Sequence, residues 1–308
     1  MRQIRMNLED LVLIILNYNS AKDTLRCLEI LRSFNMNFKI IVVDNNSTDN
    51  SIELLKNIED PQTTFLISDE NRGYGAGNNI GIHFAENHFS SNIIGIINPD
   101  IVIPNQEVII SMYNVLKNSD FAMVGGSVID NEGNYRLLNS SWDLPSFKSV
   151  VLERFLIYNR HKVPYCLNMY NDETAIVDCV AGCFFMIKAD VMKEIGYFDE
   201  NVFLYNEENI LGMKLREKGF QSIILTKQFY YHLHDFEKDK VELSLSKKCK
   251  RDWVKFQSRK YFTEKYYSKF LGFLLFFVEI FNLFQIMIGH LKNNIIKKNL
   301  KGNSSEKK

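Results

Sequence analysis

The chain has 308 residues, of which 46% are apolar, 13% are aromatic and 24% are charged. This composition excludes a disordered chain, a collagen and a bare coiled coil, and the length suffices for one or two globular domains. The 37 basic and 37 acidic residues cancel, but residues 247–308 carry a net charge of +11 and residues 1–246 a net charge of −11. A basic tail on an acidic body predicts an anionic partner for the tail, either a membrane surface or nucleic acid.

The first hundred residues alternate between strand and helix patterns. Uninterrupted apolar runs predict buried strands at 11–16, 39–43, 64–67 and 92–97. Helical spacing predicts helices at 21–34, through Leu54 and Leu55, and at 78–87. This order predicts an α/β fold with a mainly parallel sheet and right-handed crossovers. Ligands of such sheets bind beyond the carboxyl ends of the strands, where the chain places Asn19, Asp44, Asn98 and Asp100.

The second half has a less regular pattern. We expect strands at 121–129, 177–188 and 221–231, a helix at 206–218 that ends at Gly219, and a loop or lid at 140–171. Five cysteines without a CxxC pair predict free thiols, and no secretory signal precedes the first predicted strand. These features predict a reducing, cytoplasmic location.

Two motifs near the strand ends could carry chemistry, and each has an ordinary structural alternative. Asp100 follows a strand that Pro99 ends, so its carboxylate could bind a divalent cation or merely cap a turn. The glycine-rich stretch 71–79 leads into a helix whose N-terminus could receive an anion, with Arg72 adding charge. The same stretch could also be a flexible loop.

Two further pairs lie in the second half of the chain. Glu207 and Glu208 begin a predicted helix, where one could act as a general base or both could complement the helix dipole. His232 and His234 share one face of a strand end, and either could bind a metal with Asp100 as a further ligand. A packed or surface position is the alternative for each histidine.

Seven stretches occur in one order between residues 10 and 240, followed by His232 and His234. They are Leu16-Asn-Tyr-Asn19, Val42-Val-Asp-Asn-Asn-Ser-Thr-Asp49, Asn71-Arg-Gly-Tyr-Gly-Ala-Gly-Asn-Asn79, Ile97-Asn-Pro-Asp100, Gly182-Cys-Phe-Phe-Met-Ile187, Gly196-Tyr-Phe-Asp-Glu200 and Phe203-Leu-Tyr-Asn-Glu-Glu208. Together they resemble the family 2 glycosyltransferases, in particular the bacterial rhamnosyltransferase- and galactofuranosyltransferase-like branch that builds surface polysaccharides.

The resemblance implies a GT-A fold over residues 1–240, with a nucleotide-binding half at about 1–104 and an acceptor half at about 105–240. It implies a nucleotide-diphosphate sugar donor, of the dTDP-rhamnose or UDP-hexose type, and a divalent metal, Mn²⁺ or Mg²⁺. It matches the nucleotide-facing positions to Asn19, Asp44, Arg72, Gly73, Asn78 and Asn98, with Asp44 contacting the base. It matches the metal ligands to Asp100, His232 and His234.

The resemblance also implies the reaction. The base of the family is the Asp of a Glu-Asp pair, whereas this chain has Glu207 and Glu208, so the base would be Glu208. Two residues further on, where the family often has another Asp, the chain has Ile210. The implied reaction is an inverting transfer of one sugar to a hydroxyl of a glycan or lipid-linked glycan. A catalytically degenerate member that only binds nucleotide sugar or glycan is the alternative.

Residues 241–308 are predicted to form a basic helical tail. Residues 270–289 are apolar over the length of a membrane, but Glu279 near the middle argues against a spanning helix. We therefore expect the tail to lie on the anionic inner face of the cell membrane, with a homodimer interface as the alternative. The acidic body argues against nucleic acid as the partner.

Overall fold

The computed structural model describes residues 8–130, 132–135, 137–152, 166–233 and 244–305, with side chains up to residue 290. The chain forms two compact units. The sheet unit comprises Met1–Leu144 and Pro164–His234, and the helical unit comprises Pro145–Val163 and Asp235–Lys308. The helical unit therefore combines the C-terminal tail with a segment from the middle of the chain.

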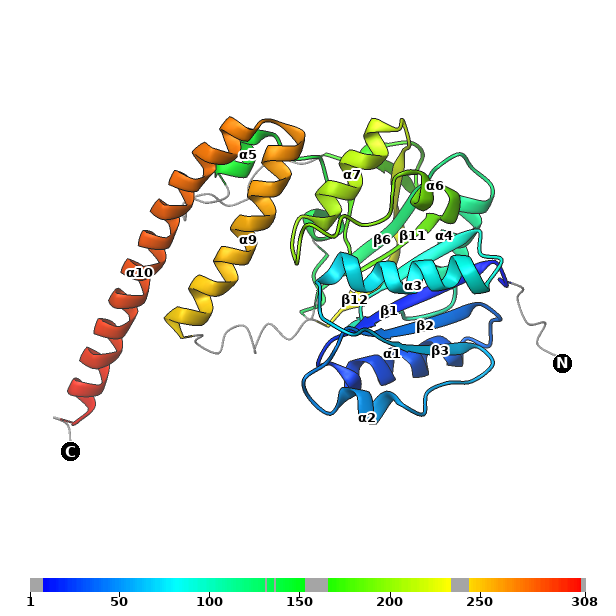
Figure 1. The fold of residues 1–308 in the computed structure, drawn as a ribbon, viewed down its shortest axis with the longest axis horizontal. Coiled ribbons are helices and arrows are strands. Elements are labelled where there is room, and N and C mark those ends of the chain that lie inside the picture. Colours follow the sequence, from blue (N-terminus) through cyan, green and yellow to red (C-terminus); the bar gives the residue numbers. More distant parts are fainter. Residues whose placement is uncertain (1–7, 131, 136, 153–165, 234–243, 306–308) are drawn as a thin grey trace. The chain divides into compact units, whose positions relative to one another are not determined.

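The amino-terminal half of the sheet unit alternates strands with helices (Figure 1). Its strands are β1 (Leu11–Asn17), β2 (Lys39–Asp44), β3 (Thr63–Ile67) and β4 (Ile93–Ile97), and its helices are α1 (Ala21–Ser33), α2 (Ser51–Leu55) and α3 (Tyr74–His88). The strands lie in the order β3-β2-β1-β4, and all of these pairs are parallel. The predicted parallel α/β arrangement is confirmed for this half.

The side chains of β1 alternate between two hydrophobic cores, one on each face of the sheet. Leu11 and Leu13 belong to the core beneath α1 and α4 (Glu107–Lys117). Val12 and Ile14 belong to the core beneath α3, α6 (Ala189–Glu194) and α7 (Glu207–Glu217). A strand that is covered on both faces has no polar positions, which explains its unbroken apolar sequence.

Helix α3 begins at Tyr74, whereas the predicted helix starts at residue 78. The first turn is rich in glycine, which is a poor helix former in isolation. A Cβ at Gly77 would lie 2.5 Å from Leu16 Cδ1, and a Cβ at Gly81 would lie 2.7 Å from Ile14 Cγ2. The glycines therefore allow α3 to pack directly on β1, and this packing outweighs their low helix propensity.

The carboxy-terminal half of the sheet unit adds strands in both directions. β11 (Phe184–Lys188) runs antiparallel between β4 and β6 (Met123–Ile129), and β12 (Ser222–His232) runs parallel beside β6. β9 (Thr174–Val177) and β8 (Asn168–Met169) extend the sheet, and β5 (Ile101–Val102) pairs with the end of β12. The helices of this half are α4 (Glu107–Lys117), α6 (Ala189–Glu194) and α7 (Glu207–Glu217). The result is a ten-stranded mixed sheet.

Two predicted segments of this half differ from the structure. The single strand predicted at 177–188 is divided among β9, β10 (Cys179–Val180) and β11, with a turn at Gly182 and Cys183 between the last two. The loop predicted at 140–171 contains β7 (Ser141–Trp142), which pairs with β10, and the helix α5 (Phe147–Leu152). Residues 153–165 of that loop lie outside the described ranges.

In its described residues, the helical unit contains α5, α9 (Leu245–Tyr266) and α10 (Lys269–Ser305). α9 and α10 are antiparallel and pack against each other as a hairpin (Figure 1). The predicted C-terminal helical segment is confirmed. Within α10, Lys269–His290 is long and apolar enough to cross a membrane by length and composition, with a mean hydropathy of 2.1.

Candidate active site

A cavity of about 500 Å³, here called the cleft, lies at the carboxyl ends of β1 and β4. Its lining residues are distant in the sequence: Leu16, Tyr18, Ser20, Asn45, Asn71, Gly73, Tyr74, Asn98, Pro99, Asp100, Phe203 and Leu204. The loops after four parallel strands and the segment before α7 therefore meet at one place. This is the edge at which open α/β sheets bind their ligands.

Asp44 is fully buried at the end of β2. Its Oδ2 accepts hydrogen bonds from Asn17 Nδ2 at 2.6 Å and from Ser47 Oγ at 2.8 Å. Its Oδ1 accepts a further bond from Ser47 N at 2.7 Å. These bonds satisfy the carboxylate and fasten the loop after β2 to the end of β1. Asp44, the predicted base contact, thus lies beneath the cleft surface.

Asn19 joins the same two loops from the exposed side. Its φ of 52° lies in the left-handed region, which Asn adopts more readily than most residues. Its Oδ1 accepts hydrogen bonds from Thr48 N at 2.8 Å and from Asp49 N at 3.2 Å, while its own backbone N donates to Ser47 Oγ at 2.9 Å. The loops after β1 and β2 therefore form one connected rim.

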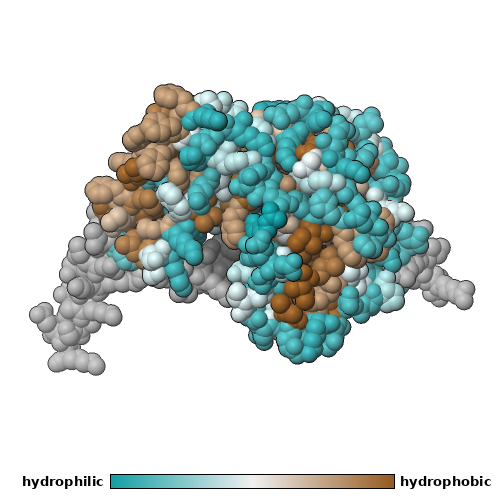
Figure 2. All heavy atoms as spheres, in the orientation of Figure 1, coloured by the Kyte–Doolittle hydropathy of each residue, from teal (hydrophilic) through white to brown (hydrophobic). Residues whose placement is uncertain are grey.

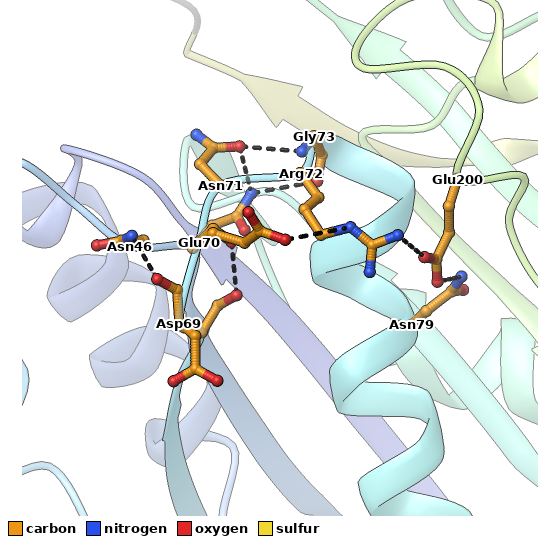
Figure 3. Close-up of polar contacts among 10 residues, drawn as sticks. Asn46, Asp69, Glu70, Asn71, Arg72, Gly73, Asn79 and Glu200 are labelled. Atoms are coloured by element: carbon orange, nitrogen blue, oxygen red, sulfur yellow. Dashed lines mark hydrogen bonds and ion pairs between the residues drawn. The ribbon is translucent and has the colours of Figure 1, made fainter.

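Arg72 is turned away from the cleft. Its guanidinium contacts Glu200 Oε2 at 2.9 Å and Glu70 Oε1 at 3.6 Å (Figure 3). The side chain lines a second cavity, of about 380 Å³, which lies beside α3. The predicted contact between Arg72 and a nucleotide in the cleft therefore requires another rotamer, in which Arg72 leaves Glu200.

Gly73 allows the segment before α7 to lie directly on the start of α3. Its φ is 103°, and a Cβ at this position would collide with the carbonyl oxygen of Phe203. Tyr74 N donates a hydrogen bond to that oxygen at 2.9 Å. Because only glycine leaves room for this contact, Gly73 fixes the position of the exposed Phe203 and Leu204 side chains in the cleft wall.

Asn78 and Asn79 are both buried in α3. Asn78, a predicted nucleotide contact, donates through Nδ2 to Tyr74 O at 3.0 Å and does not line the cleft. Asn79 Nδ2 donates to Glu200 Oε1 at 2.9 Å (Figure 3). It also donates to Phe198 O at 3.1 Å, and Asn79 Oδ1 accepts from Phe198 N at 3.1 Å. The sequence analysis missed Asn79, although two adjacent amides in an apolar helix indicate that one of them has a buried partner.

Tyr74, which the sequence analysis also missed, connects the two halves of the sheet unit. Its hydroxyl lies 2.7 Å from Gly182 O and 3.2 Å from Asn98 Oδ1. Burial, followed by the charges of Glu208 and Glu207, raises the pKa of Tyr74 well above its ordinary value. The phenol is therefore a neutral hydrogen-bond donor that links the end of β4 to the turn before β11.

Asp100 and His232 meet where β5 pairs with the end of β12. His232 Nε2 lies 3.2 Å from Asp100 Oδ2, and Leu233 N donates to Asp100 O at 2.9 Å. Burial alone would lower the pKa of His232, but its contacts with Asp100 and Cys183 raise it to about 10. The predicted ligand His234 lies outside the described residues.

Asp100 and His232 form a donor set that fits a divalent cation. A carboxylate oxygen and an imidazole nitrogen are ligands that Mn²⁺ accepts. Within the described ranges, no cluster of three or more His, Cys, Asp or Glu side chains could hold a metal. Phosphate oxygens of the substrate would supply further ligands, as is common for Mg²⁺.

Glu207 and Glu208 begin α7 and have different surroundings. Glu208 is half-buried beside Gly182, where an added Cβ would lie 2.8 Å from its Oε1. Glu207 is 6% exposed, and its buried Oε1 has no hydrogen-bond partner. Burial, and then the charge of Glu208, raises the pKa of Glu207 to about 8. At neutral pH these surroundings therefore favour the neutral form of Glu207.

The turn before α7 is strained. Tyr205 and Asn206 have φ values of 74° and 69°, and each non-glycine residue in this region costs about 1–3 kcal/mol. Asn206 Oδ1 accepts a hydrogen bond from Asn209 Nδ2 at 2.9 Å, which secures the turn against the helix. This turn directs the first residues of α7, including Glu208, towards Gly182.

The structure thus brings together some of the predicted site residues and separates others. Gly73, Asn98 and Asp100 line the cleft, His232 contacts Asp100, and Glu208 is connected to Asn98 through Gly182 and Tyr74. Asp44 and Asn78 lie beneath the surface, Asn19 holds the rim, and Arg72 lines the second cavity.

The comparisons with solved structures agree with the fold. The structure of GalNAc-T7 with UDP, GalNAc and Mn²⁺ is similar with a TM-score of 0.57 and 13% identity, over 74% of this chain and 44% of that one. The mannosyltransferase PcManGT from Pyrobaculum calidifontis, in complex with GDP-Man and Mn²⁺, has a TM-score of 0.56 and 13% identity, over 91% of this chain and 73% of that one. At these identities the likeness shows the GT-A fold, which confirms the predicted fold class.

The comparisons with sequences give the family. The chain is 27% identical over 201 residues to the low-salt glycan biosynthesis hexosyltransferase Agl10 of Haloferax volcanii, over 65% of this chain and 60% of Agl10. It is 24% identical over 211 residues to the rhamnosyltransferase WbbL of Escherichia coli K12, over 67% of this chain and 77% of WbbL. The profile of glycosyl transferase family 2 matches residues 12–196, more than half of the chain. The chain therefore belongs to glycosyl transferase family 2.

Proposed function

We propose that this chain transfers one hexose-type sugar from a nucleotide-diphosphate donor to a hydroxyl of a glycan or lipid-linked glycan, with inversion at the anomeric carbon. The observation that carries the proposal is the cleft itself. Asp100 and His232 lie at one strand end, and Tyr74 connects that end to the turn beside Glu208. The proposed site for the anionic leaving group and the proposed general base are therefore connected through Tyr74.

The names of the relatives support the class of sugar and of pathway. Agl10 is named as a hexosyltransferase of glycan biosynthesis, and WbbL as a rhamnosyltransferase. For this chain they favour a donor of the dTDP-rhamnose or UDP-hexose type and a role in surface polysaccharide synthesis.

Asp100 and His232 would hold the divalent metal, Mn²⁺ or Mg²⁺. When bound, the metal would act as a Lewis acid that neutralises the diphosphate. The contribution of the chain is to fix the two ligands, because the pairing of β5 with β12 places both side chains at the same end of the sheet. Tyr74 and Asn98 form the adjoining wall of the cleft.

Glu208 would act as the general base. Its carboxylate accepts the proton of the acceptor hydroxyl, so that one O–H bond breaks and a carboxyl O–H bond forms. The acceptor oxygen then bonds to the anomeric carbon while the bond from that carbon to the diphosphate breaks, and the diphosphate keeps the electron pair. Attack opposite the leaving group inverts the configuration. A base in this position is worth about 10²- to 10⁴-fold in rate.

Glu207 would support the base by staying neutral. Two ionised carboxylates at the start of α7 would repel each other and the anionic donor. The raised pKa of Glu207 leaves the negative charge on Glu208, which is the carboxylate that reaches the turn at Gly182. Ile210, at the position where the family often has Asp, is 1% exposed and lies on the buried side of α7.

The test is a transfer assay with dTDP-rhamnose and a panel of UDP-hexoses in Mn²⁺, which follows both nucleotide-diphosphate release and sugar transfer. Asp100→Ala should abolish turnover and metal dependence, and a chelator should do the same to the wild type. Glu208→Gln should keep donor binding but lose sugar transfer. Glu208→Asp should keep part of the transfer activity. Full activity in the chelator would remove the metal from this account. Donor binding without turnover for the whole panel would instead favour the degenerate alternative.

We further propose that the helical unit keeps the enzyme at the inner face of the cell membrane, where a lipid-linked acceptor would also reside. Its support is the apolar stretch of α10 and the excess of Lys and Arg on α9. Deletion of residues 245–308 should release the protein from membrane pellets, and unchanged sedimentation would contradict the proposal.

A further inference from the structure

The two sides of α10 have opposite chemistry. Gly272, Leu275, Glu279 and Asn282 are buried, and their spacing of three and four residues places them on one side, the inner face. Nine large apolar side chains on the remaining surface, the outer face, are 36–65% exposed: Phe270, Phe273, Leu274, Phe277, Ile280, Phe281, Phe284, Met287 and Ile288. Figure 2 shows this hydrophobic surface along α10. A surface helix of a water-soluble domain instead buries its apolar side chains and exposes its polar ones.

The carboxylate of Glu279 lies on the inner face of α10 and not on its outer face. Glu279 is 1% exposed, and its Oε1 accepts a hydrogen bond from Asn282 Nδ2 at 3.3 Å on the inner face. The sequence argument against a membrane-spanning α10 depended on this charge in the middle of the apolar run. Because the charge is enclosed within the hairpin, it does not oppose burial of the outer face in hydrocarbon.

The packing of α9 on α10 distinguishes a helix that lies in the membrane plane from one that crosses it. α9 carries eight Lys or Arg residues and two acidic residues along its length. It is packed against α10, and Phe256 of α9 contacts Phe276 at a ring-centroid distance of 6.1 Å. A crossing α10 would draw the lysines and arginines of α9 into the hydrocarbon, which is strongly unfavourable. A helix lying flat buries only its outer face.

We propose that α10 lies in the plane of the membrane, with its outer face among the acyl chains of one anionic leaflet and α9 on its water side. The inference rests on the membrane association proposed above and specifies its geometry. The basic residues of α9 place positive charge at the level of the anionic headgroups, while the phenylalanines of the outer face lie among the acyl chains below. The occupant of the outer face is thus a lipid leaflet.

The first test is flotation of the full-length protein with vesicles that contain phosphatidylglycerol. Phe277→Glu and Phe284→Glu place a charge on the outer face and should lower the vesicle-bound fraction about tenfold or more. Glu279→Gln is the control on the inner face, and Leu54→Glu is the control on the sheet unit, where Leu54 is 42% exposed. Both controls should float like the wild type. Flotation unaffected by either Phe substitution, with helicity retained in circular dichroism, would overturn the proposal.

The second test separates a flat helix from a crossing one. An epitope is added to the C-terminus, and sealed vesicles carrying the protein are treated with external protease. Digestion of the epitope is expected, whereas protection would show that α10 crosses and would overturn the inference while leaving membrane association intact. Failure of the wild type to float, together with a dimer in light scattering, would assign the outer face to a second copy. Transfer to a soluble acceptor tests the enzymatic proposal independently of both results.

Discussion

Gly182→Ala is expected to slow catalysis without unfolding the protein. A Cβ at this position would lie 2.8 Å from Glu208 Oε1, 3.2 Å from Cγ and 3.3 Å from Cδ. The backbone of Gly182 has no left-handed φ that would strain an alanine. The added methyl group therefore acts on one neighbour, and this neighbour is the end of a flexible side chain that can move.

The size of the effect follows from the displacement. To restore ordinary van der Waals contact, the Glu208 carboxylate must withdraw by roughly 0.5–1 Å. A misplacement of about 1 Å at a reacting group can cost about 10²-fold in rate. We therefore expect kcat to fall about tenfold to hundredfold, which corresponds to about 1.4–2.8 kcal/mol of transition-state stabilisation. Donor affinity and Tm should stay close to the wild type.

The assay measures kcat from nucleotide-diphosphate release, donor affinity by calorimetry, and Tm. Gly125→Ala is the matched contrast, because a Cβ there would collide with Val180 Cγ1 in the core and should lower stability by about 1–3 kcal/mol. A Gly182→Ala variant with wild-type kcat would refute the assignment of Glu208 as the base. A variant that loses stability as Gly125→Ala does would show that Gly182 matters for folding instead.

Three further outcomes are expected. Asn79→Leu should lower the free energy of unfolding by about 1–3 kcal/mol in urea, since Phe198 N loses its buried acceptor; an unchanged midpoint would contradict this. The coupling between Arg72 and Glu200, which are 55% and 35% exposed, should stay below about 1 kcal/mol in a double-mutant cycle, and a larger value would show a rigid contact. The pKa of Glu207 is about 8 in the folded state against an ordinary 4.5. Between these two pH values the folded state binds more protons than the unfolded state, so the free energy of unfolding falls as the pH rises. Glu207→Gln should remove this fall in the free energy of unfolding, measured with urea between pH 5 and 8. An unchanged pH dependence in the variant would contradict a buried, protonated Glu207.

The parallel half of the sheet could be predicted because β1, β2 and β4 are buried on both faces and leave continuous apolar runs in the sequence. The start of α3 could not be predicted, since its glycines are explained only by their distance from β1. Similarly, the apolar run at 177–188 does not show that the chain turns at Gly182 to approach α7.

The sequence placed Asp100 just after the strand that became β4, and Asp100 does line the cleft there. The family resemblance marked the distant His232, which contacts Asp100. Burial was not predictable, because the identity of Asp44 does not reveal that its neighbours already satisfy its oxygens. Tyr74 and Asn79 were missed for a related reason. Their partners lie 108 and 119 residues away, a separation that no local pattern encodes.

The shared hydroxyl of Tyr74 has a consequence for attempts to change specificity. One phenol oxygen holds Asn98, beside the proposed metal ligand Asp100, and Gly182, beside the proposed base. Substitutions that widen the proposed acceptor side by moving the turn at Gly182 will therefore also disturb the proposed diphosphate site. Libraries that randomise one side alone should yield variants with altered use of both substrates, so the two sides of the cleft should be redesigned together.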